Sequence, residues 1–174
     1  GTYTVGPIIV DASISGLDAD LSTLTGSVDS STVGYKTITF TATDYAGNSA
    51  TGDCTYQVIY DWTGFFSPVD DLPTLNSAKA GSAVPVKFSL NGDQGLGILA
   101  PDYPKVWTFP CDAGDPGEPI EETVTAGESS LTYDPIEDQY IYVWKTDKNW
   151  DDSCRQLEVK LIDGTSHLAN FRFK

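Results

Sequence analysis

Residues 29–51 read DSSTVGYKTITFTATDYAGNSAT, and this stretch decides the fold class of the first part of the chain. From residue 34 to residue 43 polar and apolar side chains alternate, which is the pattern of a β-strand with one buried face. Ile38 and Phe40 fall on the face that is expected to point inward. The sequence DYAGN that follows is rich in turn formers, and its Gly47 tolerates the positive φ of a tight turn. The stretch therefore predicts a strand, a tight turn and the start of a second strand.

The same alternation recurs along the rest of the chain. Segments rich in Val, Ile, Thr, Tyr and Phe are separated by clusters of Gly, Pro, Asp, Asn and Ser, which favour turns. Almost no stretch has the period of an amphipathic helix. Many short strands with turn chemistry between them predict an all-β fold made of antiparallel β-sandwiches. The further strands are expected at residues 54–60, 84–90, 105–109, 139–145, 156–162 and 167–173.

The chain has 174 residues, which suffices for one large domain or two small ones. A change of composition near Tyr60 divides it. The Thr- and Ser-rich part before this point holds a single cation, Lys36, whereas the part after it begins with Trp62 and a proline-containing loop. We therefore predict two modules, residues 1–59 and residues 60–174.

The charge of the chain limits its partners. Ten Lys and Arg residues stand against 25 Asp and Glu residues, which gives a formal net charge of −15. Such a surface repels the phosphates of nucleic acids and the headgroups of anionic lipids. A run of about 18 apolar residues, which a membrane-spanning helix needs, is not present. Neither nucleic acid nor membrane insertion is therefore expected.

The residue types that catalysis and metal binding need are scarce. The only histidine, His167, follows a tight-turn sequence, where a solvent-facing side chain without a catalytic partner is expected. The three cysteines, Cys54, Cys111 and Cys154, lack the CxxC spacing that would hold zinc or an iron–sulfur cluster. We therefore predict a protein that is not an enzyme and needs no cofactor.

Two parts of the chain resemble known families. The stretch that contains TATDYAGN resembles the closing strands of bacterial immunoglobulin-like domains of the HYR-like type. The second module resembles the PxKF domain, through its sequence PVKF and through residues 64–76, 80–90, 144–148 and 154–157. That domain occurs at the C-terminal end of secreted and surface proteins of bacteria and archaea. The resemblance implies tandem immunoglobulin-like sandwiches at the cell surface, and it supplies no catalytic residues.

The resemblance to the PxKF domain also points to a disulfide between Cys111 and Cys154. Cys111 follows one expected strand and Cys154 precedes another, so that both lie at strand ends that can come together. A disulfide favours an oxidising, extracellular compartment. Cys54 is then either free or bonded to another chain. Because it alternates with Tyr56 and Val58, we expect it to be buried and inert.

These expectations favour a structural module of a prokaryotic extracellular surface protein or filament. Such a module acts in assembly or adhesion, and its partners are other copies of itself or neighbouring surface-protein domains. The alternative is a carbohydrate-binding or accessory module of a secreted hydrolase, with glycans as partners. Tyr140, Tyr142 and Trp144 share one face of an expected strand, where they form either a platform for sugar rings or part of the core.

The one metal ion to consider is calcium, because several turns carry the oxygen ligands that it prefers. The chain has neither the spacing of an EF-hand nor an Asp-rich repeat. The turn residues form either a calcium site or a set of solvated side chains. The residues concerned are Asp44, Asn48, Asp70, Asp71 and Asp93.

The first module is short for its expected fold, because an immunoglobulin-like sandwich has about seven strands in about 100 residues. The usual opening strand is missing from it. Either the strand has been truncated, or a neighbouring subunit supplies it. The segment Thr2, Tyr3, Thr4 and Val5 could itself reach into a neighbour, as in pilin-type strand donation. Head-to-tail donation does not close and would build a filament.

Overall fold

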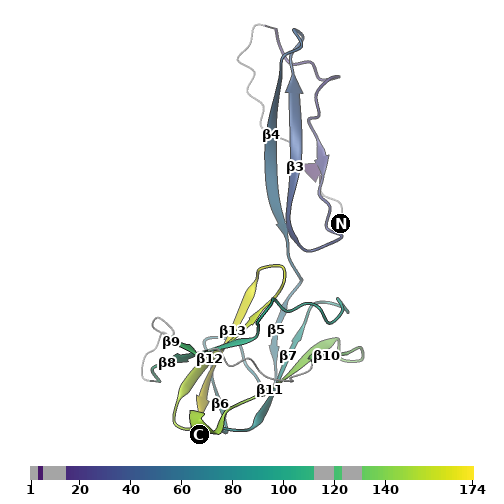
Figure 1. Cartoon of the computed structure of the whole chain (residues 1–174). Helices are drawn as coiled ribbons and strands as arrows, with labels where there is room; N and C mark the ends of the chain where they lie inside the picture. Colours follow the sequence, from purple (N-terminus) through teal and green to yellow (C-terminus); the bar gives the residue numbers. More distant parts are fainter. Residues whose placement is uncertain (1–3, 6–14, 112–119, 123–130) are drawn as a thin grey trace. The chain divides into compact units, whose positions relative to one another are not determined.

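A computed structural model describes residues 4–5, 15–111, 120–122 and 131–174. Over these residues the chain is all-β, as predicted, and its only helical turn is the short 3₁₀ helix η1, Lys148–Trp150. The chain divides into two compact units, Gly1–Ile59 and Tyr60–Lys174 (Figure 1). The composition of the sequence suggests the same two ranges. Their immunoglobulin-like classification stays a prediction.

Unit 1 is built around a long β-hairpin. β3 (Gly34–Thr43) and β4 (Ser49–Val58) have ten residues each and pair antiparallel along their whole length. Gly47 in the turn between them has a φ of 85°, so the turn that the DYAGN sequence predicts is confirmed. A second sheet of unit 1 pairs β1 (Thr4–Val5) with β2 (Gly26–Ser27).

The position of β1 bears on the expectation that Thr2, Tyr3, Thr4 and Val5 form a strand donated to a neighbour, which stays a prediction. Thr4 and Val5 pair with β2 of their own chain. Thr2 and Tyr3 lie outside the described residues. The described part of this segment is therefore used within its own unit, because β2 is available there to take up its backbone hydrogen bonds.

The two faces of the hairpin differ in chemistry, and we name them after their side chains. The threonine face consists of Tyr35, Thr37, Thr39, Thr41 and Thr43 of β3 and their partners Gln57, Thr55, Asp53, Thr51 and Ser49 of β4. The Phe40 face consists of Lys36, Ile38, Phe40 and Ala42 of β3 and their partners Tyr56, Cys54, Gly52 and Ala50 of β4. Phe40 is buried, as its place in the alternation predicts.

Unit 2 contains two sheets that pack face to face (Figure 1). The four-stranded sheet has the order β10-β11-β7-β5, and the five-stranded sheet has the order β6-β13-β12-β8-β9. The first sheet consists of β5 (Thr63–Phe66), β7 (Ala83–Ser89), β10 (Leu131–Asp134) and β11 (Gln139–Lys145). The second consists of β6 (Leu75–Ala78), β8 (Lys105–Phe109), β9 (Ile120–Glu122), β12 (Cys154–Lys160) and β13 (Ser166–Phe173). One pairing departs from the antiparallel prediction, because β6 runs parallel to β13.

The core of unit 2 lies between these two sheets. Alternate residues of the central strands point into it, as expected for strands that are buried on one face. Trp144 of β11 contacts Phe171 of β13 with their ring centroids 5.0 Å apart, so aromatic rings join the two sheets. The central strands contribute Val84, Val86, Phe88, Tyr140, Tyr142, Trp144, Leu157, Val159, Ala169, Phe171 and Phe173 to this core.

The positions of the long strands follow the sequence pattern closely. The strands expected at residues 34–43, 105–109 and 139–145 are found with the same bounds. The other expected strands differ at their ends. The largest difference is at β4, which begins at Ser49 and not at residue 54.

Candidate functional site

A disulfide joins Cys111 to Cys154, as predicted, with their Cα atoms 5.2 Å apart. Cys154 is the first residue of β12 and lies opposite Phe109, the last residue of β8. The register of two neighbouring strands thus brings the cysteines together. The bond links positions 43 residues apart, and a loop of this size restricts the unfolded chain considerably.

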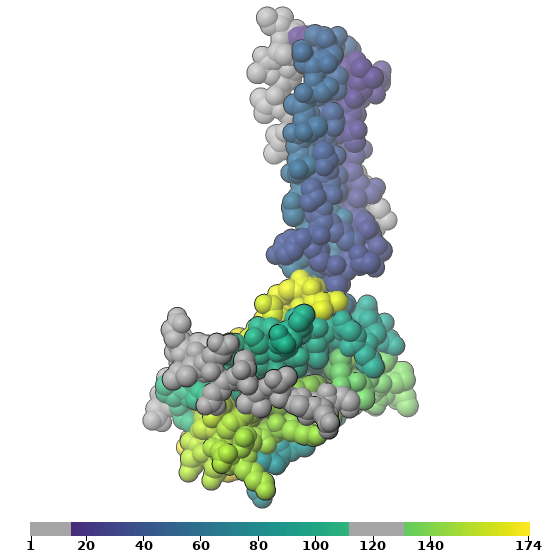
Figure 2. All heavy atoms as spheres, viewed as in Figure 1, coloured from purple at the N-terminus to yellow at the C-terminus, as the bar shows by residue number. Residues whose placement is uncertain are grey.

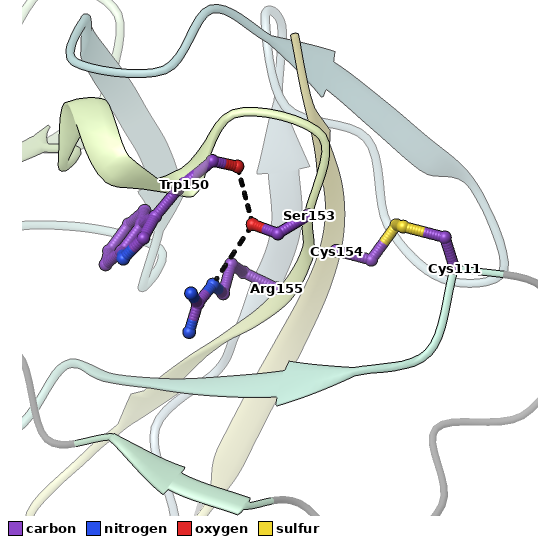
Figure 3. The surroundings of a disulfide bond; sticks show 5 residues. All are labelled: Cys111, Trp150, Ser153, Cys154 and Arg155. Atoms are coloured by element: carbon purple, nitrogen blue, oxygen red, sulfur yellow. Dashed lines mark hydrogen bonds between the residues drawn. A yellow bond between two sulfur atoms is a disulfide. The ribbon is translucent and has the colours of Figure 1, made fainter.

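Arg155 follows the disulfide on β12 and points to the other face of the sheet (Figure 3). Its side chain is buried, and its guanidinium carbon lies 5.0 Å from the centre of the Trp150 ring. The guanidinium donates hydrogen bonds to the hydroxyl of Thr108 and, through Nε, to Ser153 Oγ at 3.4 Å. Ser153 Oγ in turn donates to the backbone carbonyl of Trp150. This arrangement fastens η1 to the five-stranded sheet.

The predicted aromatic binding face does not lie on the surface. Tyr140, Tyr142 and Trp144 are 0%, 3% and 1% exposed, so the binding interpretation is wrong and the core interpretation is right. Their side of β11 faces the other sheet, whereas Val143 on the opposite side is 38% exposed. Trp144 Nε1 is buried without a hydrogen-bond partner among the described residues. Such a donor weakens the fold unless packing compensates for it.

A second polar cluster surrounds Asp138 at one end of the four-stranded sheet. Its Oδ1 accepts hydrogen bonds from the Tyr133 hydroxyl at 2.7 Å and from Gly92 N at 3.0 Å, and its Oδ2 accepts one from Ser89 Oγ at 3.0 Å. The bond from Tyr133 is the largest cause that lowers the pKa of Asp138. The same bond raises the pKa of Tyr133 to about 12. The cluster fixes the loop after β7 to the turn before β11.

The residues considered for calcium binding lie in three separate segments, which hold Asp44 with Asn48, Asp70 with Asp71, and Asp93. Asp44 accepts hydrogen bonds from Asn48 N at 2.7 Å and Asn48 Nδ2 at 2.9 Å, and the bond to the Asn48 side chain is the largest cause that lowers its pKa to about 2. Asp93 accepts from Gly95 N, and Asp71 accepts from Phe65 N. Nowhere in the described ranges do three His, Cys, Asp or Glu side chains gather in a group that could hold a metal ion. Calcium binding stays a prediction.

His167 lies against Trp62 and does not point freely into solvent, so that expectation is wrong. The two rings are stacked with centroids 3.6 Å apart and planes 5° apart. Trp62 also stacks on the buried Phe88 at 4.5 Å, so the imidazole extends a stack that begins in the core. Burial lowers the pKa of His167, although the charges of Asp163 and Asp71 oppose this shift.

Asp163, in the turn between β12 and β13, anchors the beginning of unit 2. Its buried carboxylate accepts hydrogen bonds from Tyr60 N at 2.7 Å and from the Thr165 hydroxyl at 2.7 Å. His167 Nε2 lies 3.3 Å from the same hydroxyl. Because Thr165 donates its proton to the carboxylate, its hydroxyl oxygen is left to accept a hydrogen bond from His167.

Cys54 is exposed, contrary to the expectation that it is buried. Its side chain does lie on the Phe40 face, opposite Ile38, as the alternation predicts. Burial of a strand residue also needs a layer above the sheet, and no described segment covers this part of β4. The alternation of the sequence alone cannot supply that information.

Sequence reasoning missed one group of side chains on the outer face of the five-stranded sheet. Trp107 lies opposite Gln156, and Gln156 lies opposite Asn170, so three neighbouring strands each contribute one residue to a row. All three are partly exposed. The sequence signal was their alternation with buried residues, but only the strand register shows that they are neighbours.

Comparisons with protein families, with curated proteins and with solved structures found no match for this chain. Within the described parts of the chain, no helix is long and apolar enough to cross a membrane.

Proposed function

We propose that the chain is a structural module of an extracellular surface protein or filament, and that a strand from a neighbouring copy completes unit 1. The observation that carries this proposal is the open β4 half of the Phe40 face, by which we mean the exposed residues Ala50, Gly52 and Cys54. The resemblance to HYR-like and PxKF-type modules of secreted surface proteins favours the same function.

The two halves of the Phe40 face are covered differently. On the β3 half, a Cβ built on Gly26 would come within 2.6 Å of Ile38, so β2 packs closely there. On the β4 half, Gly52 lies opposite the buried Phe40, yet a Cβ built on Gly52 would meet nothing within 4 Å. Every residue from 49 to 55 is exposed, and β4 lies at the surface of unit 1 (Figure 2).

The backbone of β4 is also incompletely paired. Among the described residues it pairs only with β3, which leaves the hydrogen-bonding groups along its other edge without a partner strand. A long free edge is a template for a strand of another chain. A donated strand would take up these backbone groups and would place its alternate side chains over the open half of the Phe40 face. Copies joined head to tail in this way form an open chain, which is a filament.

Unit 2 has the features of a stable support for such an assembly. Its disulfide suits an oxidising compartment outside the cytoplasm. Its core is closely packed with aromatic rings from both sheets. The polar clusters around Asp138, Asp163 and Arg155 connect loops and turns to strands. These groups favour a role in stability and not in catalysis.

The size of the protein in solution tests the proposal. In sedimentation velocity, we expect the wild type to form larger species as its concentration rises. Ala50→Lys places a charge on the open half of the Phe40 face and should abolish this association, because the lysine cannot be buried without a partner. Thr51→Lys places the same charge one residue further, on the threonine face, and should leave association unchanged.

Two results would contradict the proposal. One is a wild type that stays monomeric over the whole concentration range. The other is an equal response of Ala50→Lys and Thr51→Lys, because the association would then not involve the Phe40 face. Circular dichroism of both variants shows whether the hairpin keeps its strands.

A further inference from the structure

The outer face of the five-stranded sheet carries a row of three side chains, Trp107, Gln156 and Asn170, which we call the amide row. It runs across β8, β12 and β13, and each member lies directly opposite the next in the strand register. All three side chains are partly exposed. The row combines one large aromatic ring with two uncharged side chains that each carry hydrogen-bond donors and acceptors.

The indole of Trp107 has a fixed position. Its Nε1 donates a hydrogen bond to Glu158 Oε2 at 3.1 Å, so the ring extends from β8 toward the neighbouring β12. Ser166 Oγ, from β13, donates to the other oxygen of the same carboxylate at 2.7 Å. Because the indole is already ordered, a ligand that stacks on it causes little further loss of side-chain conformational entropy.

The two amides are also held in place. Gln156 Nε2 donates to Asn170 Oδ1 at 2.9 Å, which fixes the orientation of both groups. This bond uses one donor of Gln156 and the acceptor of Asn170. Gln156 Oε1 and Asn170 Nδ2 have no hydrogen-bond partner among the described residues, so an acceptor and a donor remain available side by side.

Charged residues of both signs surround the row, since Arg172 lies two positions from Asn170 on β13 and Glu121 pairs with Trp107 in the register, so neither sign dominates. The amide row itself carries no charge, and the carboxylate of Glu158 is already bound by Trp107 and a serine hydroxyl. The nearby lysines Lys105 and Lys160 both face the ring of Tyr103, with Nζ 4.9 Å and 5.4 Å from its centre. The chain as a whole has a net charge of −15, which repels anionic polymers.

We propose that the amide row binds a neutral polysaccharide of extended, β-1,4-linked pyranose units that lies across the strands. Neighbouring strands are about 4.8 Å apart, which is close to the length of one pyranose unit in such a chain. One sugar ring stacks its C–H face on Trp107, and the hydroxyls of the next units bond to Gln156 and Asn170. This site belongs to unit 2 alone and does not depend on the proposed assembly.

Isothermal titration calorimetry with soluble β-1,4-linked oligosaccharides of glucose, xylose, mannose and N-acetylglucosamine tests the proposal. We expect the wild type to bind at least one of them, with little change in affinity when NaCl is raised to about 0.5 M. Trp107→Ala should abolish binding. Gln156→Ala and Asn170→Ala should each weaken it about tenfold, as expected for the loss of one net hydrogen bond. Val143→Ala, on the outer face of the other sheet, is the control and should bind as the wild type does.

Thermal unfolding of each variant shows whether it is folded. If Trp107→Ala does not fold, the variant Gln156→Ala/Asn170→Ala, which removes no core side chain, decides the question. The proposal is overturned if the wild type binds none of the four oligosaccharides at millimolar concentration. It is also overturned if binding survives in folded variants of the amide row, or if only anionic polysaccharides such as polygalacturonate bind.

Discussion

At the scale of single residues, the stack of His167 on Trp62 links the stability of unit 2 to pH. Burial lowers the pKa of His167 below its usual value of 6.5 in the folded protein. The folded state therefore favours the neutral imidazole. The stability that depends on this group is complete above pH 6.5 and is lost as the pH falls from 6.5 toward the lowered pKa.

We expect the free energy of unfolding of the wild type to decrease as the pH falls below 6.5 in urea titrations. His167→Phe keeps a flat ring against Trp62 but cannot be protonated. Its unfolding free energy should therefore change less with pH in the same window. Parallel pH profiles of the two proteins would show that His167 does not carry this dependence.

Single residues also show where sequence reasoning ends. The alternation in β11 placed Tyr140, Tyr142 and Trp144 on one face and Val143 on the other, but both faces are hydrophobic. Which face is buried depends on the position of the second sheet, whose strands come from both before and after β11 in the chain. The stack of His167 depends on Trp62, a partner far away in sequence. Local patterns contain neither piece of information.

At the scale of elements, two glycines on the Phe40 side of the hairpin make a matched pair. A Cβ on Gly26 would come within 2.6 Å of Ile38 and 3.3 Å of Phe40, whereas a Cβ on Gly52 would meet nothing within 4 Å. We expect Gly26→Ala to destabilise unit 1 by about 1–3 kcal/mol through overpacking. Gly52→Ala should change its stability by less than about 0.5 kcal/mol.

Calorimetry of the isolated monomer measures both effects as shifts of the melting temperature. Equal shifts for the two variants would contradict the different covering of the β3 and β4 halves. The comparison is therefore a test of the open half that does not depend on assembly.

The disulfide is the second element-scale feature with a measurable effect. Cys111→Ser should lower the free energy of unfolding of unit 2 by about 3–4 kcal/mol. The disulfide links positions 43 residues apart, and without it the unfolded chain gains conformational entropy. Cys54→Ser, which removes an exposed thiol, should have almost no effect. Intact mass before and after reduction provides the direct check, since the mass must rise by that of two hydrogens. An unchanged mass, or equal stability of the two variants, would contradict the bond.

The long strands could be predicted because their signals are local. In β3, β8 and β11, β-branched and aromatic residues are concentrated between clear turn sequences. The short strand β6 has only four residues and pairs in parallel with β13, so neither its length nor its neighbour gives a local signal. The amide row escaped prediction for a similar reason, because it depends on the register of three strands.

At the scale of the whole molecule, charge sets the conditions under which copies can associate. Each chain carries a net charge of −15, so two copies repel each other at low ionic strength. At physiological ionic strength the Debye length is about 8 Å, which screens much of this repulsion. Short-range strand pairing and apolar contact at the Phe40 face can then dominate.

The reactivity of Cys54 tests the proposed strand donation most directly, because this thiol lies on the open half of the Phe40 face. The assembled protein at physiological salt and the dispersed monomer are treated with a maleimide under non-reducing conditions, and the labelled fraction is measured by mass spectrometry. The control is Thr55→Cys in a Cys54→Ser background, with its thiol on the threonine face. We expect Cys54 to react quickly in the monomer and slowly in the assembly, while the control reacts at a similar rate in both. Equal reactivity of Cys54 in the two states would contradict the donation of a strand to unit 1.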